Sequence, residues 1–192
     1  MARDSAATKA RLLDAAFAEF AAYGIAGARV DRIAEAAGAN KRLIYVYFGN
    51  KEQLFDAVIE RALAMGAETV PFDADNLPDY AGQIFDLFVA NPDLARLLFW
   101  KQLERPGATD LEVTAYRAKN AAVATAQQQG RINADLDPGD LLALVLALSQ
   151  AWFTAADGMS PTGTSSSWTT QRLAQHRTAV VHAVRRITTP HG

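Results

Sequence analysis

A glycine between two short apolar-patterned segments constrains this chain more than any other feature. Residues 30–37 carry small and branched apolar side chains at helical spacing, and a second helical segment opens at Asn40. Gly38 lies between them, where a tight turn requires a positive φ that only glycine adopts cheaply. Asn40 can cap the second helix, because its side-chain oxygen can accept a hydrogen bond from a free backbone N–H. The sequence therefore predicts two short helices joined by a tight turn.

The second of these helices begins with two adjacent cations, Lys41 and Arg42, and carries Tyr45 and Tyr47 along its side. A cation at a helix N-terminus opposes the helix dipole and costs roughly 0.3 to 1 kcal/mol at an exposed site. Two of them together suggest that an anionic partner compensates the charge. Ordinary solvated surface charge is the alternative interpretation, which the helix-turn-helix spacing disfavours. The pattern favours a helix-turn-helix that enters a DNA groove.

Residues 9–63 resemble the N-terminal DNA-binding domain of the tetracycline-repressor (TetR) family. The resemblance rests on residues in the family's order and spacing, namely residues 33–38 (Ile-Ala-Glu-Ala-Ala-Gly), Lys41, Tyr45, Tyr47-Phe48, Lys51-Glu52 and Leu54-Phe55. Two departures occur, since Ala28-Arg29 replaces the usual small hydroxyl residues and Asn40 replaces the usual Ser. Arg29 offers a charge-assisted phosphate contact in place of the missing hydroxyl.

The candidate DNA-binding residues follow from the motif and the resemblance. They are Arg29, Asn40, Lys41, Arg42, Leu43, Tyr45, Tyr47 and Lys51. We assign Tyr45, Tyr47 and Lys51 mainly to phosphate, whereas Lys41, Arg42 and Leu43 are placed to reach base edges. Arg42 and Lys51 are both expected to be exposed.

Charge is unevenly distributed along the chain. The formal net charge of -2 disfavours a nucleic-acid partner. Residues 29–51, however, hold five cations (Arg29, Arg32, Lys41, Arg42, Lys51) against two anions (Asp31, Glu35), and beyond residue 60 acids exceed bases. A basic patch on an acidic body can orient a protein on DNA while limiting non-specific adhesion.

Helical periodicity is nearly continuous, so the predicted fold class is all-α: an N-terminal three-helix DNA-binding domain with a helix-turn-helix, followed by a C-terminal helical bundle. An apolar stripe ends at Gly24, and Asn50 caps a longer helix that ends before Pro71. Later helices are expected over residues 78–90, 92–104, 110–129, 138–157 and 168–187, with a mobile loop at 158–167. The predicted domains are residues 1–50, a connecting helix at 51–70, and residues 71–192.

The body after residue 78 offers little catalytic chemistry. The chain has no Cys, and His176 and His182 are six residues apart, which is not the spacing of a helical metal pair. No phosphate-binding glycine loop or nucleophile elbow is present. We therefore expect no enzyme activity, no cofactor and no metal. The charged N-terminal segment lacks an apolar signal core, and no apolar run is long enough to span a membrane, so a cytoplasmic protein with no membrane partner is expected.

Large aromatic residues are the body's main feature. The resemblance implies a ligand cavity among its helices, and the candidate lining residues are Phe85, Phe88, Phe99, Trp100, Leu103, Tyr116 and Trp152. Plain core packing is the alternative for each. The resemblance also implies that the last two helices pair with a second subunit. The candidate interface residues are Leu144, Leu148, Leu173, Val180 and Val184.

The function predicted from these features is ligand-controlled repression. A homodimer would place two recognition helices in successive major grooves of a near-palindromic operator in double-stranded DNA, and a small apolar or aromatic effector would release it. Two alternatives stay open. One is a DNA-binding dimer without an effector, and the other is a helical enzyme or carrier that holds an anionic metabolite at Lys41 and Arg42.

Overall fold

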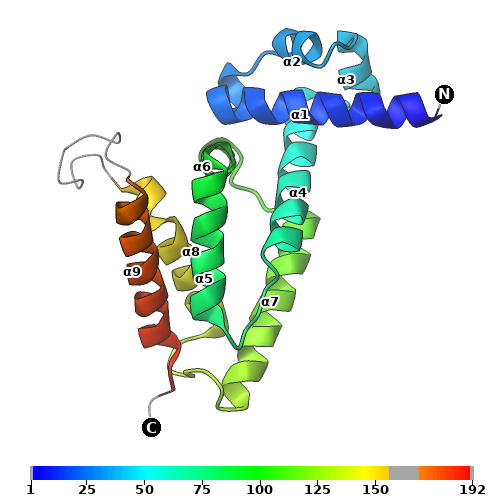
Figure 1. Cartoon of the computed structure of the whole chain (residues 1–192). Helices are drawn as coiled ribbons and strands as arrows, with labels where there is room; N and C mark the ends of the chain where they lie inside the picture. Colours follow the sequence, from blue (N-terminus) through cyan, green and yellow to red (C-terminus); the bar gives the residue numbers. More distant parts are fainter. Residues whose placement is uncertain (1, 156–168, 191–192) are drawn as a thin grey trace. The chain divides into compact units, whose positions relative to one another are not determined.

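The structure is a computed structural model that describes residues 2–155 and 169–190, with side chains from residue 5 onward (Figure 1). All regular elements in these ranges are helices, which confirms the predicted all-α class. They are α1 (Ala2–Gly27), α2 (Val30–Ala36), α3 (Lys41–Phe48), α4 (Lys51–Thr69), α5 (Leu77–Ala90), α6 (Pro92–Glu104), α7 (Asp110–Gln128), α8 (Pro138–Thr154) and α9 (Thr170–Thr188). The predicted loop at 158–167 lies outside the described residues.

The helices form two compact units that do not follow the order of the sequence. The N-terminal unit contains residues 1–66 and 91–112, and the C-terminal unit contains residues 67–90 and 113–192. Helix α6 therefore belongs with the N-terminal helices, although the sequence placed it in the body. The predicted domain boundary at residue 70 stays a prediction, because these units are defined by contacts and not by sequence order.

Helix α1 is the central helix of the N-terminal unit. Leu12, Ala16 and Phe20 recur at i, i+4 and i+8 and are completely buried, so one stripe of α1 faces the core. The Phe20 ring meets the Phe55 ring of α4 edge to face, with centroids 5.1 Å apart. Helices α2 and α6 both pack against α1. The apolar stripe predicted from the sequence is thus the buried face of α1 in this unit.

Gly24 breaks α1 near its end, as the sequence predicts. Its φ of 66° and ψ of -174° are non-helical, and this backbone conformation is open almost only to glycine. The two amides that follow the break are bound by α6, because the Glu104 carboxylate accepts hydrogen bonds from the N–H groups of Ile25 (2.5 Å) and Ala26 (3.2 Å). The Trp100 ring lies against Gly24, since a Cβ added there would sit 2.9 Å from Trp100 Cδ2. Together, Glu104 and Trp100 fasten α6 to the Gly24 turn.

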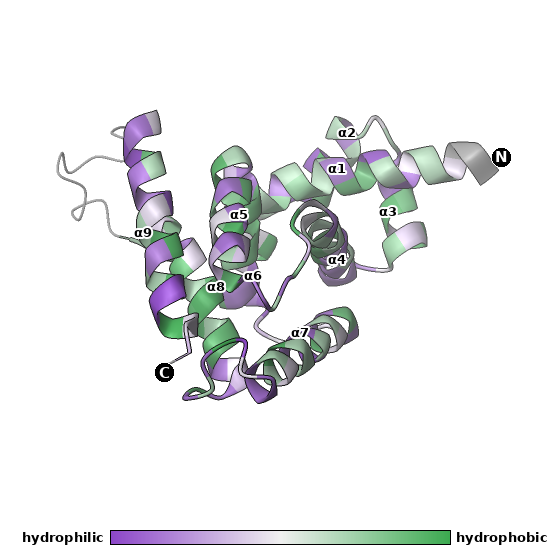
Figure 2. Ribbon diagram, turned by 60° about the horizontal axis from the view of Figure 1, so that its bottom comes forward, coloured by the Kyte–Doolittle hydropathy of each residue, from purple (hydrophilic) through white to green (hydrophobic). Residues whose placement is uncertain are grey.

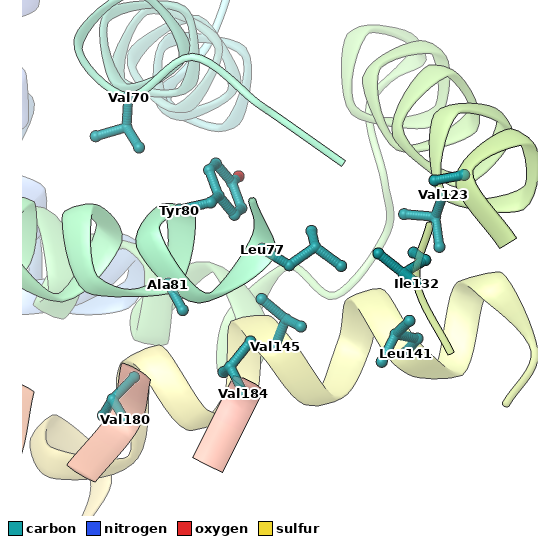
Figure 3. Close-up of a cluster of buried hydrophobic side chains, with 11 residues drawn as sticks. Val70, Leu77, Tyr80, Ala81, Val123, Ile132, Leu141, Val145, Val180 and Val184 are labelled. Atoms are coloured by element: carbon teal, nitrogen blue, oxygen red, sulfur yellow. The ribbon is translucent and has the colours of Figure 1, made fainter. Parts of the chain in front are cut away.

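Three helices, α5, α8 and α9, pack on one another in the C-terminal unit. Their shared core also receives side chains from α7, from the loop after α7 and from the link between α4 and α5. It comprises Val70, Leu77, Tyr80, Ala81, Val123, Ala126, Ile132, Leu141, Val145, Val180 and Val184 (Figure 3). Helix α9 shows hydrophilic and hydrophobic colours along its length, as a helix with one buried face should (Figure 2).

Among the described residues, no helix combines the length and apolar content that crossing a membrane requires.

Candidate nucleic-acid interface

The turn between α2 and α3 has the geometry that the sequence predicts. Gly38 adopts a φ of 58°. The Asn40 side-chain oxygen accepts a hydrogen bond from the Arg42 backbone N–H at 2.8 Å, so Asn40 caps α3 as expected. Asn50 caps α4 in the same way, through the Gln53 N–H at 2.7 Å. Local side-chain chemistry therefore fixes where the recognition helix begins and where the next helix takes over.

A buried carboxylate from α1 holds the start of α2. Glu19 accepts hydrogen bonds from the Arg29 backbone N–H and from Arg32 Nε, both at 2.8 Å. Burial raises the pKa of Glu19, but the hydrogen bonds and charges of Arg32 and Arg29 outweigh it and leave the pKa below its usual value. The Arg32 guanidinium also lies over the Tyr23 ring, 4.4 Å from its centroid. Arg32 therefore serves to position α2.

Lys41 has an anionic partner within the chain, and this modifies the argument from the helix dipole. Its ammonium lies 2.8 Å from Asp31 of α2, and both side chains are largely exposed. The hydrogen bond from Lys41 lowers the pKa of Asp31, and the same bond raises the pKa of Lys41. The pair links α2 to α3 across the turn. An external anion is therefore not required to compensate Lys41, and the dipole argument for a DNA partner rests on Arg42.

The expectation that Lys51 is exposed is wrong. Its side chain is half-buried, and Nζ donates a hydrogen bond to the Ala28 carbonyl oxygen at 3.3 Å. The ammonium reaches this carbonyl because the first turn of α4 lies beside the link between α1 and α2. Removing Lys51 would thus disturb the unit as well as any phosphate contact.

The outward face of α3 carries the groups available to DNA. Arg42 is exposed, and its guanidinium forms no ion pair or hydrogen bond with any described side chain. Tyr45 is also exposed, and Val46 is 64% exposed. Sequence reasoning missed Val46, although its place one residue after Tyr45, on the side opposite buried Ile44, could have signalled it. An exposed valine on a recognition helix is suited to contact thymine methyl groups.

Two of the remaining predicted DNA contacts are less accessible. Leu43 and Tyr47 are half-buried. The Tyr47 hydroxyl accepts a hydrogen bond from Ser5 Oγ at 3.1 Å, which ties α3 to the start of α1. Arg29 is exposed at the N-cap of α2, where its side chain makes no cap hydrogen bond. The structure thus leaves Arg29, Arg42, Tyr45 and Val46 exposed, whereas the exposed side chains of Lys41 and Asn40 are engaged within the motif by Asp31 and by the Arg42 N–H.

The predicted ligand-lining residues are divided between the two units. Phe99, Trp100 and Leu103 lie on α6 in the N-terminal unit, and Leu103 is 75% exposed. The others lie in the C-terminal unit and comprise Phe85, Phe88, Tyr116 and Trp152. Their place in a cavity stays a prediction. Trp100 already has a packing partner in Gly24, which the sequence did not predict.

Phe85, Phe88 and Trp152 belong to one aromatic cluster in the C-terminal unit. Phe85 and Phe88 both contact the Phe153 ring, at centroid distances of 5.7 and 5.6 Å. His176 of α9 joins the cluster, 4.6 Å from the Trp152 ring and 5.4 Å from the Phe85 ring. Its Nε2 atom is buried without a hydrogen-bond partner. Sequence reasoning considered His176 only as half of a possible metal pair, whereas the structure places it against the buried Phe85 ring and the half-buried Trp152 ring.

The C-terminal unit is expected to lose stability in mild acid because of His176. Burial lowers the pKa of His176 below its usual 6.5, and the charge of Arg172 lowers it further. The folded state therefore binds a proton less readily than the unfolded state, so the free energy of unfolding falls as the pH drops below about 6.5, until the folded pKa is passed. Thermal unfolding between neutral pH and pH 5 measures this. His176→Phe should flatten the decline, whereas His182→Phe, on an exposed site of the same helix, should not.

The candidate interface residues differ in availability. Val180 and Val184 are 4% and 0% exposed within their own subunit. They face α5 and α8 and fill the core, which corrects their assignment to a dimer seam. Leu144 is 43% exposed, and Leu148 and Leu173 are half-buried. Leu144, Leu148 and Leu173 remain predicted seam residues, although Leu148 also packs against the core.

The fold and the motif together define a class, the helix-turn-helix DNA-binding proteins. Comparison with known proteins gives the family. Residues 12–58 match the family described as "Bacterial regulatory proteins, tetR family", and residues 76–186 match "Tetracyclin repressor-like, C-terminal domain". The chain therefore belongs to the TetR family of transcriptional regulators.

The described residues contain no group of three or more His, Asp or Glu side chains arranged to hold a metal ion.

Individual relatives agree with this assignment. The HTH-type transcriptional repressor SCO4008 from Streptomyces coelicolor is 46% identical over 77% of this chain and 79% of its own length. The structure of SCO4942 from the same organism, described as a transcriptional regulator, is 36% identical, with a TM-score of 0.77 over 94% of this chain and 98% of that one. AibR is 16% identical, with a TM-score of 0.66 over 92% of this chain and 97% of that one, and this likeness shows the fold alone.

Proposed function

We propose that this protein is a homodimeric repressor that binds a near-palindromic operator and is released by a small effector. The observation that carries the proposal is the outward face of α3, where Arg42, Tyr45 and Val46 are open to solvent beside a capped, tightly held turn. Such a face fits the major groove of B-DNA. The relative SCO4008 is named a repressor, which supports repression as the sign of regulation.

Two copies of α3 are needed for tight and specific binding. One recognition helix covers only a half-site, and a dimer would place the second about 34–36 Å away, one helical turn along the duplex. The operator should then have two related half-sites. Residues 51–66 of α4 belong to the N-terminal unit and the rest of the helix to the C-terminal unit, so α4 is suited to carry a signal from an effector. The effector must bind the DNA-incompetent state better by a few kcal/mol.

The effector is proposed to occupy the C-terminal unit. AibR, which shares the fold, has been crystallised with isovaleryl coenzyme A and operator DNA. The half-buried rings of Trp152 and Phe153 and the exposed Tyr116 are apolar surface that a small aromatic molecule could contact. A DNA-binding dimer without an effector remains the second candidate, and the dense packing of Phe85 and Phe88 against Phe153 favours it.

A gel shift with the DNA upstream of the protein's own gene tests the DNA-binding function. If the operator lies in this region, a specific repressor should give a discrete complex that survives excess competitor DNA. Footprinting should then show two related half-sites. A complex that competitor removes completely would contradict the assignment of a specific operator.

Arg42→Ala should weaken operator binding by about 1–3 kcal/mol, because a bidentate contact from arginine to a guanine edge is worth this much. Preference at one operator position should relax, while the melting temperature should not change, because the guanidinium is exposed and forms no ion pair or hydrogen bond with the described residues. Fluorescence anisotropy on matched and mutated operators measures both effects. Arg96→Ala, on an exposed site of α6, removes the same charge and should leave the affinity nearly unchanged. Wild-type affinity in Arg42→Ala would remove Arg42 from the site.

A further inference from the structure

Three aromatic rings surround the ammonium group of Lys119 in the C-terminal unit. Its Nζ atom lies 5.5 Å from the centroids of the Phe72 and Tyr80 rings and 5.7 Å from that of Tyr116. It also donates a hydrogen bond to the Tyr80 hydroxyl at 3.0 Å. These contacts bring together the loop before α5, α5 itself and α7. We call Phe72, Tyr80, Tyr116 and Lys119 the ring cluster.

The Lys119 ammonium has no carboxylate partner among the described residues, although its side chain is half-buried. Charged groups that leave water are normally paired, because their lost hydration must be replaced. The acidic residues nearest in sequence to Phe72 and Tyr80 have partners of their own. Asp73 accepts a hydrogen bond from the Asp75 backbone N–H at 2.9 Å, Asp75 pairs with Arg131, and Asp79 accepts a hydrogen bond from the Gln83 side chain at 2.6 Å.

The ring cluster has a buried side and a solvent-exposed side. Tyr80 is 3% exposed, whereas Tyr116 is 41% exposed and Val113, one turn earlier on α7, is also exposed. An ammonium has three N–H donors, and the Tyr80 hydroxyl accepts from one of them. Lys119 can therefore still donate to an anion that arrives from the open side, where an aromatic ring could stack on Tyr116.

We propose that the ring cluster binds a small aromatic monoanion, with its carboxylate at the Lys119 ammonium and its ring against Tyr116. The inference rests on the proposed function and names the chemical class of the effector. A cationic ligand fits less well, because the rings already hold a cation that is tethered to the site and would have to be displaced.

Titration calorimetry of the full chain with three probes of similar size tests the charge that the site prefers. Benzoate should bind more tightly than neutral benzamide, and benzyltrimethylammonium should bind least. Lys119→Met should weaken benzoate binding about tenfold or more, the loss expected for one charge-assisted hydrogen bond, and should leave benzamide unaffected. Arg117→Met removes an exposed cation from the same helix and should change nothing.

A second variant keeps the test decisive if Lys119→Met does not fold. Tyr116→Leu removes the exposed aromatic ring and should weaken the binding of benzoate and benzamide alike. Tighter binding of benzyltrimethylammonium than of benzoate would overturn the proposal, as would no benzoate binding at about 10 mM, a concentration that suffices for a fragment of ordinary ligand efficiency. Operator gel shifts on the same preparation distinguish failure of the proposed site from failure of the proposed function. Benzoate binding without operator binding would reject the regulator but keep the site, whereas operator binding without benzoate binding would reject the site alone.

Discussion

Leu144→Asp is expected to convert the protein to monomers and to remove most of its operator affinity. Leu144 is the large apolar side chain of α8 that stands furthest out of its own subunit, at 43% exposure. In the proposed dimer it would be buried, and a carboxylate there would lose its hydration without gaining a partner, which costs several kcal/mol. A monomer reads only one half-site and should bind the operator at least about 100-fold more weakly, since the second half-site contributes several kcal/mol.

Sedimentation velocity at micromolar concentration and anisotropy on the operator measure the two effects. Ala143→Asp adds the same charge at the adjacent exposed position, which points away from Leu148, and should remain dimeric. The subunit fold should survive in both variants, because neither residue lies in the core. A dimeric Leu144→Asp protein, or a wild type that sediments as a monomer, would show that α8 is not the seam.

Gly24→Ala is expected to destabilise the N-terminal unit by about 3 kcal/mol. Two costs combine at this position. The φ of 66° with ψ of -174° strains any residue that has a Cβ. The added carbon would also lie 2.9 Å from both Glu104 carboxylate oxygens and from Trp100 Cδ2. Relief of the contact would require Glu104 to leave the Ile25 and Ala26 amides.

Urea unfolding curves of the wild type and the variant give the change in stability. Gly107→Ala is the matched control in the same unit, because its φ is not positive and no heavy atom lies within 4 Å of the added carbon. That variant should be neutral or slightly stabilised through its less flexible unfolded chain. Equal stabilities for the Gly24 and Gly107 variants would mean that α6 does not hold the turn tightly.

Features set by neighbouring residues could be predicted from the sequence. Gly38 takes a positive φ, and Asn40 and Asn50 cap the helices they precede. Asp137 caps α8 through the Gly139 N–H at 2.7 Å, again as its position before Pro138 indicates. In each case the determining contact spans only two or three residues, so the sequence contains both partners side by side.

Features set by distant partners could not be predicted. Lys51 meets the Ala28 carbonyl and Trp100 meets Gly24, and both contacts depend on how whole helices pack. Val180 and Val184 have the spacing of an apolar stripe, which looks the same whether it faces its own core or a partner. Their burial depends on α5 and α8, far away in the sequence. The position of the DNA-binding surface was predictable but not all of its residues, since exposed Val46 of α3 was missed and Lys51 of α4, which is half-buried, was expected to be exposed.

The location of α6 sets a limit on how this regulator can be cut and recombined. The stretch that matches the family's DNA-binding part ends at residue 58, yet the N-terminal unit also uses residues 91–112. A chimaera that takes only residues 1–66 would leave the Ile25 and Ala26 amides without their acceptor and one side of α1 without its cover. A DNA-binding unit that is to be transferred to another protein must therefore include α6. On the ribosome, likewise, the unit cannot be completed until residue 112 has been made, after α5 has already been synthesised.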